Sequence, residues 1–143
     1  MTYGEKAAEL KNTLNCGQSV IVALADLAGL DEKTAKAVGT GLGGGLRCGE
    51  ACGAYCGAVL ALSLTLGADG MGKPGGAVAE ATKKFADDFK EKFGAIRCED
   101  LLNAVGGDHS VCNGFCAWCA DEAAKVIEGT SKQALCTAEG GAP

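Results

Sequence analysis

The sequence predicts an all-α fold, a compact single-domain helical bundle with a cysteine-rich core site. Apolar residues recur at spacings of three and four along most of the chain, which is the period of an amphipathic helix. No alternating run of apolar and polar residues is long enough to indicate a strand. The length of 143 residues suits one hydrophobic core. We expect residues 1–136 to form this domain and residues 137–143 to be a disordered C-terminal tail.

The first third of the chain predicts two helices and an irregular segment. Asn15 is a suitable N-cap for a helix over Cys16–Ala28, because its side chain can accept a hydrogen bond from a free amide of the first turn. Asp31 has the same role for a shorter helix over Glu32–Val38. The glycine-rich segment Gly39–Gly45 is too flexible for either regular element.

Four further helices are expected in the rest of the chain. A long one runs from about Cys48 to Leu66, and an amphipathic one covers Gly75–Phe93, with aromatic residues on one side and charged residues on the other. A short helix is expected at Cys98–Ala104 and another at about Val111–Glu128.

Charge and hydropathy exclude two classes of partner. The net charge of −5 and the scattered positions of the 13 lysines and arginines argue against nucleic acid. The uncharged run Ala51–Ala68 approaches membrane-spanning length, but it contains glycine, cysteine, serine and threonine, so we interpret it as a buried bundle helix without membrane insertion. The polar start of the chain does not resemble an export signal, which favours a cytoplasmic location.

Cysteine is the residue type that indicates function. Nine cysteines in a helical sequence without an export signal favour metal or redox chemistry over structural disulfides, because the cytosol keeps thiols reduced. They are Cys16, Cys48, Cys52, Cys56, Cys98, Cys112, Cys116, Cys119 and Cys136.

Cys48, Cys52 and Cys56 are spaced four apart. Residues at this spacing lie on one face of a helix, roughly 5–6 Å apart at Cβ. The first and third thiols would then lie about 12 Å apart along the axis, too far to share one small cluster. Either the first turn is not helical, or the third thiol has another role.

A second set, Cys112, Cys116 and Cys119, falls on one helical stripe. Cys116 and Cys119 form a C-x-x-C pair, which at a helix start can hold a reactive thiolate. No histidine follows the pair, which excludes covalent haem attachment. Zinc is a weaker alternative, because a structural zinc site usually needs a second such pair or added histidines, and His109 is expected to be an exposed loop residue.

The motif Cys52-Gly53-Ala54-Tyr55-Cys56-Gly57 resembles that of a redox-active family named for its spaced cysteines, the C-GCAxxG-C-C family, which is distantly similar to the split-Soret cytochrome domain. Asn15–Val20, Gly41–Gly45, Phe93–Leu102 and Ala123-Ala124 are similar to its other blocks. The resemblance implies a shared site at Cys16, Cys52, Cys98 and Cys116. It also implies cluster binding, because the split-Soret domain accompanies an iron–sulfur centre.

We therefore expect a helical iron–sulfur protein that transfers electrons to a partner protein, with the cluster type left open. The alternatives are a thiol–disulfide oxidoreductase using Cys116/Cys119 or Cys52/Cys56, and a metal storage or sensor module. Whether the protein is an enzyme stays open. A core lined by alanine and glycine favours a homodimer. A possible second site comprises Cys48, Cys56, Cys112 and Cys119, and Cys136 is expected to be exposed.

Overall fold

The computed structural model describes residues 1–67 and 76–140, and side chains as far as Thr130. These residues form helices linked by turns, with no strand among them and a single bridge between Ala51 and Arg97. The predicted all-α single domain is therefore confirmed. The helices are α1 (Tyr3–Leu10), α2 (Cys16–Ala23), α3 (Ala25–Ala28), α4 (Glu32–Gly39), α5 (Gly53–Leu66), α6 (Ala77–Phe93), α7 (Cys98–Asn103) and α8 (Cys112–Gly140). Three short helical turns are η1 (Thr40–Leu42), η2 (Gly45–Gly49) and η3 (His109–Val111).

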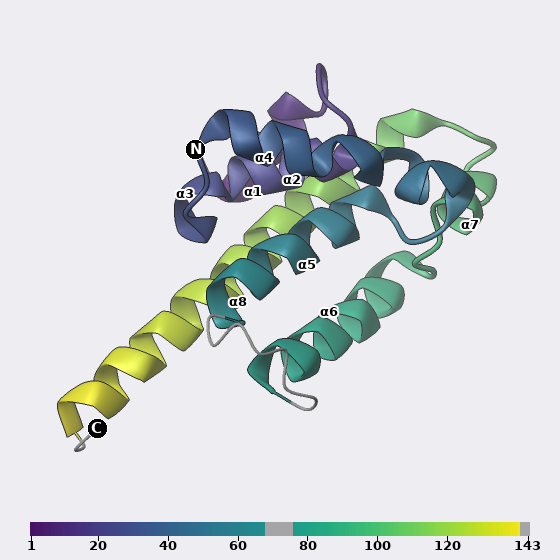
Figure 1. Ribbon diagram of the computed structural model, residues 1–143. Coiled ribbons are helices and arrows are strands. Elements are labelled where there is room, and N and C mark those ends of the chain that lie inside the picture. The colour runs from purple at the N-terminus through teal and green to yellow at the C-terminus, as the bar shows by residue number, and fades with distance from the viewer. Residues whose placement is uncertain (68–75, 141–143) are drawn as a thin grey trace.

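Helices α5 and α8 lie side by side in the middle of the molecule, and α2 packs against both (Figure 1). Helix α1 packs on α8 and α2, and α4 covers α2. Helix α6 packs along α5 on the other side of the bundle (Figure 1). The bundle therefore has a two-helix centre with small helices on one face and α6 on the opposite face.

The start of α2 agrees with its sequence prediction. The Asn15 side chain accepts a hydrogen bond from the Gln18 amide at 2.8 Å, and the Gln18 side chain accepts one from the Asn15 amide at 3.2 Å. This reciprocal capping box fixes the position of Cys16 at the first residue of the helix. The expected helix over Cys16–Ala28 is divided at Leu24, whose backbone leaves helical geometry, into α2 and α3.

The expected helix start at Cys48 is wrong, because α5 begins at Gly53. Gly44 and Gly45 take left-handed conformations, and Leu46 and Arg47 continue them at φ of 59° and 63°. The right-handed helix cannot pass through this turn. The alternative in which the first turn is not helical is therefore the correct one.

Aromatic side chains join α6 to the two central helices. Phe85 and Phe89 of α6 are buried, and their rings lie within 6.4 Å of Tyr55 on α5 and Trp118 on α8, measured between ring centroids. The charged residues of α6 face solvent, as its amphipathic pattern predicts. The expected first residue of this helix, Gly75, lies outside the described residues.

The last helix is longer than its pattern predicts. Helix α8 starts at Cys112 and runs to Gly140, past the expected end at Glu128. The division of the chain at residue 136 stays a prediction, since residues 141–143 lie outside the described part. Over the two described stretches, no helix combines the length and apolarity that a membrane crossing needs.

Candidate functional site

Five cysteines lie at or near the start of a helix. Cys16, Cys98 and Cys112 are the first residues of α2, α7 and α8, and Cys52 is the N-cap of α5. Cys116 follows one turn into α8. The first amides of a helix lack intrahelical acceptors and carry partial positive charge. Thiolates placed at these ends are therefore stabilised by the backbone.

These thiols are neighbours although they come from separate segments. The Cys16 thiol interacts directly with the thiols of Cys112 and Cys116, and the Cys116 Sγ lies 3.8 Å from the Cys16 carbonyl oxygen. Electrostatic interactions join Cys52 to Cys16 and to Cys98, and Cys98 to Cys112. We name Cys16, Cys52, Cys98 and Cys112, the four cysteines at helix starts that these interactions link, the thiol ring, and Cys116 adjoins it through Cys16.

A short backbone bridge places Cys52 and Cys98 together. The Cys52 amide donates to the Ile96 carbonyl at 2.8 Å, and the Cys98 amide donates to the Glu50 carbonyl at 2.6 Å. On the outer side, the Arg97 guanidinium pairs with the Glu50 carboxylate at 3.2 Å. These contacts explain how residues nearly fifty positions apart deliver two thiols to one site.

Glycines allow the thiol-bearing segments to approach closely. Gly45 has a φ of +63°, and a Cβ there would lie 2.6 Å from the Cys98 Cβ and clash with the Glu50 carbonyl. A Cβ on Gly53 would lie 3.2 Å from the Cys16 Cβ. Gly45 and Gly53 therefore leave the space that lets these segments pack closely at the site.

The thiols of the ring are held in their neutral form. Burial raises the pKa of Cys52 to about 12, although the amides of Tyr55 and Ala54 act against it. For Cys16, the Cys112 thiol lowers the pKa, but the Cys116 thiol and burial outweigh it and bring it to about 12. Burial also raises the pKa of Cys98, and the Cys16 thiol together with burial raises that of Cys112. Metal binding at these thiols would therefore release protons.

The proposed second set is only partly assembled. Cys119 is buried beside Cys52, Cys16 and Cys56, and burial raises its pKa. Cys48 is instead exposed on η2, and its thiol lies 3.6 Å from the Gly45 carbonyl oxygen. The structure therefore brings Cys56 and Cys119 to the main site and leaves Cys48 outside this network of thiols. The side chain of Cys136 lies outside the described residues.

A site for a single metal ion is not preformed. Among the residues that the structure describes, no group of three or more His, Cys, Asp or Glu side chains is arranged to hold one ion. His109 is exposed in η3, as expected of a loop histidine. An iron–sulfur cluster places less demand on thiol spacing, because its cysteines bind different irons. The sulfur donor set therefore fits a cluster better than it fits zinc.

The role of Cys112 was not foreseen from the sequence. Its spacing placed it with Cys116 and Cys119 on one helical stripe, and the resemblance pointed to Cys116. The signal for Cys112 is its position as the first residue of α8, after the turn that Asp108 caps by accepting from the Ser110 amide at 2.9 Å. A cysteine at a helix start occurs in each of the other three segments of the ring.

The fold and the site define a helical protein whose helix starts converge on buried thiols. The model of one protein family, described as "Putative redox-active protein (C_GCAxxG_C_C)", matches residues 14–130. Because the match covers most of the chain, this protein belongs to that redox-active family, as its cysteine motifs predict. Comparisons with curated proteins and with solved structures found no match.

Proposed function

We propose that this protein binds an iron–sulfur cluster through buried cysteines and transfers electrons to a partner protein. The observation that supports this most is the convergence of thiols from α2, α5, α7 and α8 at the starts of those helices. A bound cluster supplies reversible one-electron chemistry, and four cysteines are its usual ligands.

Both the sequence and the geometry support three of the proposed ligands. Cys16, Cys52 and Cys98 are the predicted cysteines that belong to the thiol ring, and their helix-start amides offset the negative charge of thiolates. The fourth ligand comes from α8. The family resemblance favours Cys116, and the proximity of Cys112 to Cys16 makes Cys112 the other candidate.

Burial counts against the thiol–disulfide alternative. Such an enzyme needs a thiolate that can meet the disulfide of another molecule. Cys116 and Cys119 are both 0% exposed, and Cys52 is 3% exposed with a pKa raised to about 12 by burial. The Cys116/Cys119 pair would therefore react slowly unless the bundle opens, whereas in the Cys52/Cys56 pair only the half-buried Cys56 is partly accessible.

The proposal includes a reducing compartment such as the cytoplasm, where the thiols stay available to iron. It also includes a redox partner protein of unspecified identity. The expected homodimer and the storage or sensor alternative stay predictions. A sensor or storage module that holds iron without sulfide would lack the cluster's visible charge-transfer bands.

Anaerobic purification or reconstitution with iron and sulfide tests the function. We expect a brown protein with iron and acid-labile sulfide in equal amounts. Cys16→Ser, Cys52→Ser and Cys98→Ser should each lose most of the iron, whereas the exposed Cys48→Ser should retain it as the matched control. Cys112→Ser and Cys116→Ser identify the fourth ligand, because only the ligand's variant should lose iron. A wild-type protein that takes up no iron, or three variants that keep full iron content, would contradict the proposal.

A further inference from the structure

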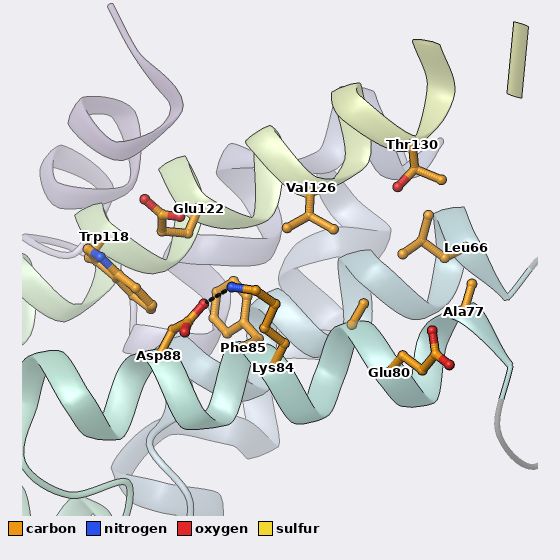
Figure 2. A pocket seen from close by; sticks show the side chains of 11 residues that line it. Leu66, Ala77, Glu80, Lys84, Phe85, Asp88, Trp118, Glu122, Val126 and Thr130 are labelled. Carbon is orange, nitrogen blue, oxygen red and sulfur yellow. Dashed lines mark hydrogen bonds and ion pairs between the residues drawn. The ribbon is translucent and has the colours of Figure 1, made fainter. Parts of the chain in front are cut away.

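A pocket lies between α6 and α8, on a side of the bundle that none of the cysteines lines (Figure 2). Its volume is about 420 Å³, within the range of small-molecule sites. Leu66 of α5 closes one end (Figure 2). Ala77 and Ala81 of α6 and Val126 of α8 provide the apolar walls.

Two aromatic rings form a firm apolar surface inside this pocket. The ring centroids of Phe85 and Trp118 are 5.3 Å apart, with the planes at 58°. Phe89, which is fully buried, packs edge-on against Trp118 at 5.8 Å and supports it from behind. A supported aromatic surface needs little rearrangement to accept a flat apolar group.

The polar residues around the pocket are predominantly acidic. Glu80, Asp88 and Glu122 contribute three carboxylates, against the single ammonium of Lys84. Lys84 pairs with Asp88 at 2.6 Å within α6 (Figure 2), and Glu122 pairs on its outer side with Lys125 at 3.1 Å. The four lining groups sum to −2, or to −1 when Lys125 is counted with its partner Glu122, so the potential over the aromatic rings favours a cation over an anion.

We propose that this pocket binds a small aromatic organic cation. Its ring packs on Phe85 and Trp118, and its positive group lies near the carboxylates of Glu80 and Glu122. Aromatic faces attract organic cations through their quadrupole, which adds to the attraction of the carboxylates. This site is separate from the thiol ring, so the inference does not depend on the proposed function.

Trp118 makes the binding measurable, because it is the only tryptophan in the chain. Phenyltrimethylammonium is the probe, and benzenesulfonate is its anionic counterpart with the same ring. We expect saturable quenching of Trp118 fluorescence by the cation and at least tenfold weaker quenching by the anion. Added salt should weaken the cation's binding, since the attraction is partly electrostatic.

Three variants of the full-length protein locate the probe. Ala81→Leu fills the pocket without changing its charge and should abolish saturable quenching. Glu122→Gln keeps the size of a half-buried side chain and should weaken binding of the cation about threefold to tenfold. Glu91→Gln makes the same change on α6 outside the pocket and should have no effect. Circular dichroism checks that each variant is folded. If Ala81→Leu does not fold, Glu122→Gln still tests the proposal.

Three results would overturn the proposal. Equal quenching by both ions would remove the charge preference, and saturable quenching that survives both pocket variants would place the probe elsewhere. Sedimentation that shows dimers formed through this face, with Trp118 inaccessible to the probe, would make the pocket part of a contact between two copies of the chain.

Discussion

Single glycines determine how closely the thiol-bearing segments approach. Gly44 and Gly45 share a φ of +63°, but a Cβ on Gly44 meets nothing within 4 Å, whereas one on Gly45 meets Cys98 and Glu50. Gly44→Ala should therefore cost only its backbone strain, about 1 kcal/mol of unfolding free energy. Gly45→Ala should cost about 2 kcal/mol more, because packed atoms must move. Urea unfolding of the two variants measures the difference, and equal losses would contradict the packing role.

At the scale of single residues, the sequence indicated which residue type matters for function better than it indicated which cysteines lie together. The segments of Cys16, Cys52 and Cys98, which the family resemblance singled out, lie together in the structure, and their role as a shared site stays a prediction. The four-residue spacing predicted Cys48 and Cys52 on one face of a regular helix. The backbone leaves helical geometry between these two residues, so Cys48 lies elsewhere. No local pattern could place Cys112 near Cys16, since their proximity depends on how α2 and α8 pack.

The elements around the site depend on long-range contacts as much as on propensity. Local chemistry predicted the caps Asn15 and Asp31, whose side chains accept from amides in their own first turns. It did not predict where α5 begins. The bridge between Ala51 and Arg97 holds the chain extended up to Cys52, and the two bridged segments lie far apart in the sequence. Such pairing overrides the helix preference of neighbouring residues.

Arg97 holds this bridge from the outside, and its removal should act locally. The Arg97 and Glu50 side chains are 45% and 53% exposed, so Arg97→Ala should cost at most about 1 kcal/mol of global stability. The amides of Cys52 and Cys98 should nevertheless exchange hydrogen several-fold faster, because they form the bridge that Arg97 covers. Lys83→Ala removes a more exposed pair with Asp87 on α6 and is the control. Unchanged exchange at both cysteines would show that the bridge holds without its ion pair.

At the scale of the whole molecule, the thiols and the aromatic residues organise different parts. The cysteines of the thiol ring connect α2, α5, α7 and α8, whereas α6 contains no cysteine. Helix α6 is held instead by the stacked rings of Phe85, Phe89 and Phe93 against α5 and α8. A ligand that binds the ring should therefore stabilise one part of the bundle far more than the other.

Hydrogen exchange with and without iron tests this division. Removing the cluster should increase exchange at the starts of α2, α5, α7 and α8, because ligand binding there adds to folding free energy. Exchange in α6 should change little. Phe89→Ala should produce the opposite pattern, since deleting a fully buried ring costs about 3–5 kcal/mol and its contacts lie in the aromatic layer. If iron removal deprotects α6 as strongly as α2, the bundle unfolds as one cooperative unit. The Phe89→Ala measurement needs no iron, so it tests the independence of α6 even if the cluster proposal fails.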